Sequence, residues 1–595
     1  MKSWKIVAGL LCIWVAVMMY MSMSVMQTGE ANQLTEYKLK QALDEMDKLK
    51  SQNEELQKLA VDIKLWSRYR DTQSVQGRPR SGRPRATTQA QDRFIRTLAL
   101  RNRVITANQI SARLQTDTGV RVRPSLYHEK RRRKMENTNH EFWFYIRAEL
   151  LKMKDMVKDN DHVKNKLDNI LETSFDYQKT LYSDLFHLKN VDNVSEWKRD
   201  EAQALGDLVQ RRFIYLQNPE NCSSAKKIVC NLHKGCGYGC QLHHVVYCFI
   251  VAYATKRTLV LESKGWRYAS HGWESVFLPL SKTCTDRVGI SNKHWGPLNV
   301  IENVQVVELP IVDSMYPRPD FMPLAVPADL ATRLFRIHEN PSVWWIGQIV
   351  KYLTRPQDAL LKDMENTKAK LGFQNPTVGV HIRRTDKVGV EAAFHPIEEY
   401  MVHVEEYYDK REMVKIIQQR RVYLATDDAA VLAEARKKYP KYIFISDNEV
   451  SKTAGLGTRY TDASLRGIIL DIHFLSLTDF LVCTFSSQVC RVAYELMQTL
   501  HDDASQNFYS LDDVYYFGGQ NAHNLVAVEK YTAKDHKEID LEVGDLVGIA
   551  GNHWNGYSKG INRRTGKSGL YPSYKVENRV SVADMPRYNE IDEVS

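Results

Sequence analysis

Two arginines lie where a predicted strand meets a loop, and their type and position suit phosphate chemistry. The apolar run from Thr377 to Ile382 is followed directly by Arg383 and Arg384, and Glu391 comes a few residues later. Guanidinium groups pair with phosphate oxygens in a planar, two-pronged geometry, so they can neutralise a diphosphate leaving group without a metal. A carboxylate such as Glu391 can accept the proton of an attacking hydroxyl. The pattern favours group transfer from a diphosphate donor over the alternative, a solvated arginine pair on a surface loop.

Metal-binding motifs compete poorly with this interpretation. The triplet Asp159-Asn160-Asp161 has the form of a metal-nucleotide motif, but it lies in a polar helical stretch and does not follow a strand. Cys236 and Cys240 have the spacing of half a zinc site, yet no second pair follows at ligand spacing. Disulfide bonding is the better interpretation of these cysteines, and we expect no bound metal.

The elements that must position the arginines alternate between strand and helix from Cys222 to about Asp513. Two further β-rich runs, Arg421–Ala425 and Phe480–Phe485, also end in polar loops, Thr426-Asp427-Asp428 and Ser486-Ser487. This alternation predicts an α/β region with an open, mostly parallel sheet. Ligands of such sheets bind beyond the carboxyl ends of the strands.

A hydrophobic segment near the amino terminus predicts a membrane anchor. Residues Ile6 to Met26 form a run of 21 without a charge, long enough to cross about 30 Å of hydrocarbon as a helix. Lys2 and Lys5 precede it, so the positive-inside rule leaves a short cytosolic tail and a lumenal bulk. A cleaved signal peptide is the alternative, but the run lacks a clean cleavage site and exceeds the usual length. Eight of the nine cysteines lie outside it, an even number that suits an oxidising lumen.

A heptad pattern follows the anchor. Two series of residues spaced by seven form its a/d seam: Leu39, Met46, Asn53 and Ala60, and Ala42, Leu49, Leu56 and Ile63. The seam predicts a coiled-coil stem, in which the polar Asn53 at an a position favours a dimer. A single amphipathic helix is the alternative. Helical periodicity returns from Glu141 to Leu216.

The positive charge of the chain is concentrated in one segment. The formal net charge is +10, but the segment from Lys64 to Lys134 carries 19 Lys or Arg against 4 Asp or Glu and leaves the remainder at −5. A Gly-Arg-Pro-Arg repeat from Gly77 precedes short helical patterns there, as in a helix-turn-helix with a minor-groove arm. The segment resembles the amino-terminal DNA-binding part of Tc1/mariner-type transposases, without an acidic catalytic triad. Behind a membrane anchor such a module meets no DNA, so we interpret it as inserted mobile-element sequence or a gene-model artefact, without a nucleic-acid function.

Five motifs in the rest of the chain resemble those of the core α-1,6-fucosyltransferases. They are Val378-Gly-Val-His-Ile-Arg-Arg-Thr-Asp-Lys-Val-Gly with Glu-Ala-Ala-Phe-His-Pro from Glu391, Tyr423-Leu-Ala-Thr-Asp-Asp, Ser464-Leu-Arg-Gly-Ile-Ile-Leu-Asp, Cys483-Thr-Phe-Ser-Ser-Gln-Val-Cys and Gly235-Cys-Gly-Tyr-Gly-Cys-Gln-Leu-His-His. The resemblance covers the chain from about residue 135 to its end, together with the anchor and the first stem helix. It implies an α/β, GT-B-like Rossmann catalytic region. The implied reaction is inverting, metal-independent transfer of fucose from GDP-fucose to the innermost N-acetylglucosamine of N-glycans, in α-1,6 linkage.

The resemblance also implies which residues bind the donor. They form a set of six: Arg383, Arg384, His381, Asp471, Ser487 and Tyr268. Arg383 would hold the β-phosphate with help from the second arginine and the serine. The histidine and the aspartate would read the guanine, and the tyrosine would help to close the nucleotide site.

The same resemblance implies the catalytic and acceptor residues. Glu391 would be the general base on the acceptor 6-hydroxyl, which Lys387 would polarise, and Arg383 completes the catalytic set. The acceptor contacts would be Lys234, Asp313, Asp512 and His553. The only substrates implied are GDP-fucose and the N-glycan, with no cofactor and no metal.

Four disulfides are implied by the resemblance, whereas counting eight cysteines alone leaves 105 connectivities open. The implied pairs are Cys222 with Cys284, Cys230 with Cys248, Cys236 with Cys240, and Cys483 with Cys490.

The carboxyl-terminal segment from Gln520 to Val576 predicts a small β-barrel. It resembles an SH3 domain through Ala527-Val-Glu-Lys-Tyr, Gly544-Asp-Leu-Val, Trp554 and Gly569-Leu-Tyr-Pro-Ser-Tyr. Glu529 and Lys575 stand where the aromatic groove for proline-rich ligands needs tyrosine. We therefore expect a role in acceptor binding or dimer contact.

The predicted organisation follows from these patterns. It comprises a cytosolic tail (1–5), a transmembrane anchor (6–26), a coiled-coil stem (27–65), the basic insert (66–134), a helical stem region (135–216), the catalytic domain (217–513) and the SH3-like domain (520–581). The expected protein is a homodimeric, single-pass type II protein of the Golgi membrane with a lumenal catalytic region. Two other classes remain open, an inactive SH3-type binding protein on a glycosyltransferase scaffold and a DNA-binding protein.

Overall fold

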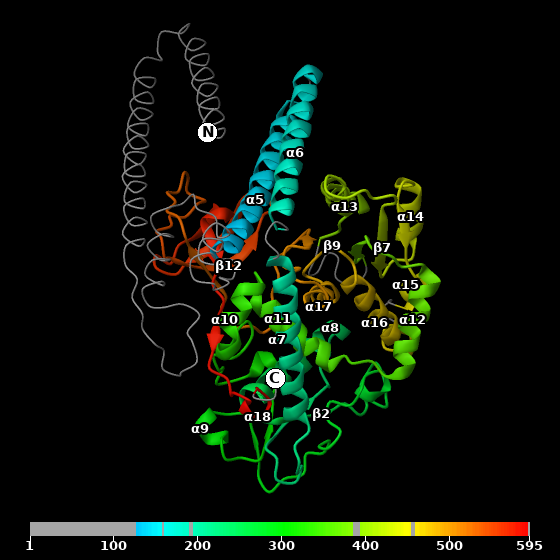
Figure 1. Cartoon of the computed structure of the whole chain (residues 1–595), viewed down its shortest axis with the longest axis vertical. Coiled ribbons are helices and arrows are strands. Elements are labelled where there is room, and N and C mark those ends of the chain that lie inside the picture. The colour runs from blue at the N-terminus through cyan, green and yellow to red at the C-terminus, as the bar shows by residue number, and fades with distance from the viewer. Residues whose placement is uncertain (1–125, 158–159, 190–193, 385–392, 454–457, 593–595) are drawn as a thin grey trace, which may run out of the picture. The chain divides into compact units, whose positions relative to one another are not determined.

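The computed structural model describes residues 126–595, except for 158–159, 190–193, 385–392, 454–457 and 593–595 (Figure 1). The predicted tail, anchor and coiled coil and most of the predicted insert lie outside the described residues. Among the helices that the structure describes, none combines the length and apolar character needed to cross a membrane.

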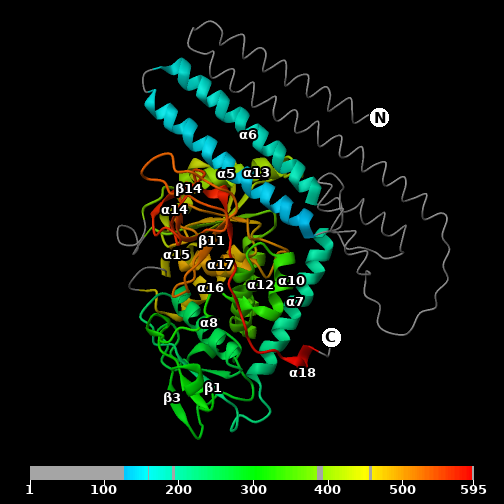
Figure 2. The ribbon, with the colours of Figure 1, turned by 90° about the vertical axis from the view of Figure 1, so that its left-hand side faces the viewer.

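Three long helices open the described part: α5 (Leu126–Met156), α6 (Asp161–Lys189) and α7 (Val194–Gln217). Helices α5 and α6 pack along each other as a hairpin (Figures 1 and 2). Asn160 caps α6, because its Oδ1 accepts a hydrogen bond from the Val163 N–H at 3.2 Å. This residue of the Asp159-Asn160-Asp161 triplet thus has a local structural role, and Asp159 lies outside the described residues.

The predicted basic insert overlaps the first described helix, because α5 begins at Leu126, inside the range 66–134. Arg132 Nε lies 2.9 Å from Glu129 Oε2, and Lys198 Nζ of α7 lies 2.9 Å from Glu129 Oε1 and 3.4 Å from Asp503 Oδ2. All four side chains are at most 9% exposed. Residues 126–134 therefore belong to the helical region. The motif resemblance and the charge count both placed them in the insert, and neither can distinguish a solvated basic run from one held in a buried ionic cluster.

Two separate parallel sheets form the catalytic region, where the sequence predicted one. Their strand orders are β2-β1-β4-β3 and β10-β9-β6-β7-β8. The strands are β1 (Lys227–Asn231), β2 (Thr258–Glu262), β3 (Asn292–His294), β4 (Val306–Glu308), β6 (Val378–Ile382), β7 (Arg421–Thr426), β8 (Ile443–Ile445), β9 (Phe480–Cys483) and β10 (Phe508–Ser510). Paired Rossmann-type sheets are the architecture implied by a GT-B-like scaffold.

Helices cover both sheets and connect their strands. They are α8 (Tyr238–Ala254), α9 (Leu298–Ile301), α10 (Ala328–Ile337), α11 (Pro341–Leu353), α12 (Asp358–Leu371), α13 (Ile397–Glu412), α14 (Ala430–Lys438), α15 (Asn448–Thr453), α16 (Asp462–Ser476) and α17 (Gln488–Met497). Helices α8 and α11 are buried on nearly all sides, as their continuous apolar composition requires. Strand β6 is buried along its whole length. A Cβ at its Gly379 would lie 2.7 Å from Thr478 Oγ1, so only glycine permits this close packing.

The carboxyl-terminal barrel has five antiparallel strands: β11 (Asn524–Ala527), β12 (Leu546–Asn552), β13 (Tyr557–Asn562), β14 (Ser568–Pro572) and β15 (Val576–Asn578). Lys575 Nζ forms an ion pair with Glu529 Oε2 at 2.7 Å, so the two non-aromatic residues of the groove contact each other. After the barrel, β16 (Val582–Ala583) pairs with β5 (Val326–Pro327), and α18 (Asn589–Asp592) ends the described chain. The tail thereby returns to the segment between the two parallel sheets in the chain, since β5 lies between β4 and β6.

Candidate active site

The candidate site lies at the carboxyl edge of the second sheet, where three neighbouring strands end together. Strand β6 is followed by Arg383 and Arg384, β7 by Asp427, and β9 by the loop that leads to Ser487. Because β9, β6 and β7 are adjacent and parallel, these loops share one edge of the sheet (Figure 1).

Arg384 is held in place by one acid of the β7–α14 connection and one of α14 itself. Its backbone N–H donates to Asp427 Oδ1 at 2.8 Å, and its NH1 donates to Glu434 Oε2 at 2.9 Å. The guanidinium carbon lies 5.0 Å from the centre of the Phe394 ring. Neither Asp427 nor Glu434 is among the site residues predicted from the sequence. The position of Asp427 directly after a strand could have indicated it, but its pairing with Arg384 depends on strand order.

His381, the fourth residue of β6, is 7% exposed. Burial lowers its pKa to about 4, with Asp427 opposing this shift and Arg383 adding to it. The imidazole is therefore neutral at physiological pH and offers one donor and one acceptor to a ligand.

Ser487 stands at the N-cap position of α17 and is 1% exposed. Its Oγ has no hydrogen-bond partner within the described residues. The preceding Ser486 N–H donates to the Asp512 carboxylate at 3.3 Å, and Asp512 Oδ1 also accepts from Ser510 Oγ at 3.0 Å. A buried hydroxyl at a helix N-terminus suits an anionic ligand, and Asp512, a predicted acceptor residue, lies directly beside it.

The first Rossmann-type unit is the part of the chain built on the sheet β2-β1-β4-β3, and the second is built on β10-β9-β6-β7-β8. The first unit approaches this edge through Tyr268, in the loop after β2. The Tyr268 hydroxyl accepts a hydrogen bond from the Tyr238 N–H at 2.9 Å. Burial raises the pKa of this phenol, and the positive charge of Arg383 opposes the rise. A Cβ on Gly239 of α8 would lie 2.8 Å from Gln488 Cβ of α17. The two units therefore meet at the amino-terminal ends of α8 and α17.

Two predicted acceptor residues meet at the carboxyl edge of the first sheet. Lys234 follows β1, Asp313 follows β4, and Lys234 Nζ lies 3.5 Å from Asp313 Oδ2. Strands β1 and β4 are parallel neighbours, which explains why residues 79 positions apart form an ion pair. Lys234 is further fixed through its carbonyl, which accepts from Gln241 Nε2 at 2.7 Å.

Asp471 lies on α16, and its Oδ1 accepts a hydrogen bond from Tyr423 of β7 at 2.8 Å. Burial raises the pKa of Asp471 to about 7, although the Tyr423 hydroxyl opposes this shift. The carboxyl group consequently changes charge near neutral pH.

His553 is exposed in the loop between β12 and β13 of the barrel. The neighbouring Trp554 ring lies 5.3 Å from Tyr509 of β10 and 5.9 Å from Phe144 of α5, measured between centroids. This loop therefore packs against the strand that leads to Asp512. The remaining predicted residues, Lys387 and Glu391, lie outside the described residues, so their roles stay predictions.

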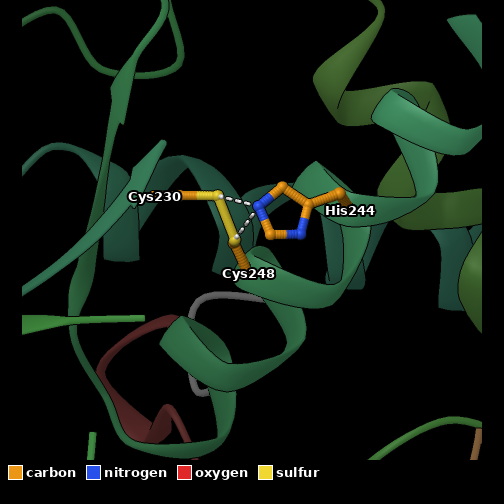
Figure 3. A group of neighbouring side chains, drawn as sticks. All are labelled: Cys230, His244 and Cys248. Carbon is orange, nitrogen blue, oxygen red and sulfur yellow. Dashed lines mark hydrogen bonds between the residues drawn. A yellow bond between two sulfur atoms is a disulfide. The ribbon is translucent and has the colours of Figure 1, made fainter. Parts of the chain in front are cut away.

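The four disulfides implied by the resemblance are present: Cys222–Cys284, Cys230–Cys248, Cys236–Cys240 and Cys483–Cys490. Cys236 and Cys240 are thus bonded to each other and do not form half of a zinc site. Figure 3 shows His244 Nε2 beside another pair, 3.7 Å from Cys230 Sγ and 3.9 Å from Cys248 Sγ. This group resembles a metal-ligand set, but its two sulfurs are joined and offer no thiolate.

A cavity of 1230 Å³ lies between α5, α13 and the barrel. Trp554, Tyr509 and Glu141 are among the residues that line it, but none of the predicted donor or acceptor residues is. Volume alone therefore does not locate the candidate site.

The fold and site together define a GT-B-like glycosyltransferase that carries an SH3-like barrel. Residues 1–516 match the family model described as alpha-(1,6)-fucosyltransferase N- and catalytic domains, and residues 527–577 match a variant SH3 domain. The chain is 52% identical to an alpha-(1,6)-fucosyltransferase of Drosophila melanogaster over 78% of this chain and 75% of that protein. It is 47% identical to an alpha-(1,6)-fucosyltransferase of Caenorhabditis elegans over 66% of this chain and 70% of that protein. This chain belongs to the α-(1,6)-fucosyltransferase family.

Similar solved structures include the fucosyltransferase NodZ from Bradyrhizobium and the SH3 domain of yeast NBP2. The first is 12% identical, with a TM-score of 0.30, and the match covers 46% of this chain and 93% of that one. The second is 28% identical, with a TM-score of 0.09, and the match covers 10% of this chain and 97% of that one.

Proposed function

We propose that this fucosyltransferase moves fucose from GDP-fucose to the 6-hydroxyl of the innermost N-acetylglucosamine of N-glycans, with inversion and without a metal. The main support is the carboxyl edge of the second sheet. There Arg383 and Arg384 lie on one strand end, while Ser487 presents a buried hydroxyl at the N-terminus of α17. Fixed cations and a helix N-terminus together stabilise the charge that a diphosphate gains as it leaves.

The proposed chemistry is a single displacement. Glu391 accepts the proton of the acceptor 6-hydroxyl while Lys387 polarises that hydroxyl, and the oxygen attacks C1 of fucose. The bond from C1 to the β-phosphate oxygen breaks, and its electron pair leaves on GDP, where Arg383 stabilises the new charge. Arg384, which pairs with Glu434, assists in holding the diphosphate, as the family resemblance implies.

The direct test is turnover of GDP-fucose with an N-glycopeptide acceptor in excess EDTA. We expect an α-1,6-linked product on the innermost N-acetylglucosamine, because fixed arginines replace the metal as the electrostatic catalyst. Loss of transfer that manganese restores would contradict the metal-independent mechanism. A product with another linkage or acceptor sugar would contradict the proposed specificity.

Donor binding is expected to weaken on acidification because of Asp471. Guanine presents N–H donors, so we propose that it needs Asp471 as a carboxylate, and the pKa of this group is about 7. The charged form is lost as the pH falls through that value, so the affinity for GDP-fucose should drop. Well below the pKa, the drop should approach tenfold for each pH unit. His381, with a pKa of about 4, stays neutral between pH 5.5 and 8.5.

The measurement is calorimetric titration with GDP-fucose in the absence of acceptor. GDP-fucose is preferred to GDP because its phosphates lack the terminal ionisation near pH 6. The Asp471→Asn variant should bind GDP-fucose weakly at pH 8, and its affinity should not change with pH. If the affinity of the wild type and of this variant changes equally with pH, Asp471 does not bind the guanine.

The barrel is proposed to contribute to acceptor binding through His553. Replacing it by alanine should raise the acceptor KM by about 2- to 10-fold, the value of one ordinary hydrogen bond, and leave kcat nearly unchanged. His536→Ala, which removes another exposed barrel histidine, is the matched control. If both variants keep the wild-type KM, the barrel has no acceptor role through this loop.

We further propose a single-pass anchor in the Golgi membrane, a lumenal catalytic region and a homodimer. The uncharged run 6–26 and the four disulfides support the first two parts. Exposed apolar side chains on the α5–α6 hairpin, such as Phe142 at 58% and Tyr177 at 73%, support the third. No nucleic acid takes part in this function.

A further inference from the structure

Three chain segments meet at one buried carboxylate, Glu495 of α17. Its side chain is 0% exposed. Glu495 Oε1 accepts a hydrogen bond from the Tyr515 hydroxyl at 2.7 Å, and His243 Nε2 of α8 lies 3.0 Å from both carboxylate oxygens. The contact joins residues 252 positions apart and links α8 of the first Rossmann-type unit with α17 of the second.

The hydrogen-bonding roles follow from the geometry. His243 Nδ1 is buried without a partner within the described residues, so the proton belongs on Nε2, where it can be donated to Glu495. The pKa of the Tyr515 phenol is raised well above its usual range by burial and by the charge of Glu495, which keeps the hydroxyl a donor. One carboxylate thus receives two donors, and loss of either leaves it buried and undersatisfied.

Each of the three segments also carries a residue of the candidate site. Helix α8 follows the loop with Lys234, α17 begins directly after Ser487, and Tyr515 comes three residues after Asp512. The Ser486 N–H donates to Asp512, so the donor and acceptor segments are already in contact. Glu495 is not part of this contact, since its hydrogen bonds join it to His243 and Tyr515.

We propose that Glu495 is a positioning residue for acceptor binding. By holding Tyr515 and His243, it fixes the segment with Asp512 and the loop with Lys234 relative to the N-terminus of α17. The inference rests on the proposed function, since it takes those residues as acceptor contacts. The placement of these segments matters because a displacement of the bound substrate by about 1 Å can lower the rate about 100-fold.

The test compares half-buried Tyr515 with buried Tyr494, each of which donates one hydrogen bond. Tyr515→Phe removes the bond to Glu495. Tyr494→Phe, on α17 itself, removes a bond of 2.8 Å to the Ser505 carbonyl and serves as the matched control. Both variants should lower the melting temperature by similar amounts. Only Tyr515→Phe should raise the KM for the N-glycopeptide, by about tenfold, while the Kd for GDP-fucose changes less than twofold.

A double-mutant cycle shows whether Tyr515 acts through Glu495. Glu495→Gln keeps the shape but not the charge, and Tyr515→Phe combined with it should raise KM no more than the worse single variant. Additive effects, or equal KM values for Tyr515→Phe and Tyr494→Phe, would overturn the inference.

Direct titration of the glycopeptide onto the GDP complex separates this outcome from failure of the proposed function. If the wild type binds glycopeptide and Tyr515→Phe binds it equally well, only the positioning role is wrong. If the wild type neither transfers fucose nor binds the glycopeptide, the proposed function fails and the inference fails with it.

Discussion

Arg383→Ala is expected to lower kcat by about 10²- to 10³-fold, the usual effect of removing one electrostatic donor to a transition state. Arg383 directly follows β6 and acts electrostatically on both His381 and Tyr268. It is therefore within electrostatic range of both Rossmann-type units, between which the leaving diphosphate is proposed to lie. Arg383→Lys should recover only part of the activity, because an ammonium group cannot pair with two phosphate oxygens in a plane.

Two other arginines provide the comparison. Arg384→Ala should have a smaller effect than Arg383→Ala, because the family resemblance gives Arg383 the β-phosphate and Arg384 only an assisting role. Arg436→Ala removes an exposed arginine of α14 and should leave turnover unchanged. Steady-state kinetics with GDP-fucose measure all four variants. Near-normal turnover by Arg383→Ala would remove this residue from the diphosphate site.

Two deletions that differ by nine residues are expected to behave very differently. Removing 66–125 should leave fucosyl transfer intact, whereas removing 66–134 also takes away Glu129, Arg132 and Arg133. Although burial alone would raise it, the pKa of Asp503 is held well below its usual range by His338, Lys198 and Arg133. The longer deletion leaves Lys198 and Asp503 buried with part of their cluster missing, and breaking a buried ion pair costs about 3 to 5 kcal/mol.

Thermal unfolding and transfer assays on the two deletion proteins measure this difference. Both deletions should lose the nonspecific, salt-sensitive DNA binding expected of the basic segment, so DNA binding serves as the control for removal. Equal melting temperatures would show that the ionic cluster does not stabilise the fold. Loss of transfer in a folded protein that lacks 66–125 would show that the basic segment takes part in function.

The sequence by itself determined the features that depend on residues close together in the chain. The strand at Thr377–Ile382, its terminal arginines and the barrel follow from local periodicity and turn chemistry, since apolar alternation and chain reversal are short-range properties. The motif resemblance added the family and the cysteine pairs, which counting alone left open.

Tertiary structure decided what depends on strand order and burial. The division into two sheets, the bond from the Arg384 N–H to Asp427 and the ion pair of Lys234 with Asp313 exist because particular strands are neighbours. Local sequence carries no record of that order. Likewise, the amino-acid composition at the start of α5 does not reveal whether its basic residues are solvated or buried. Only the packing of α5 against α7 and Asp503 places them in the enzyme, because a buried charge is stable only beside partners that the chain brings from far away.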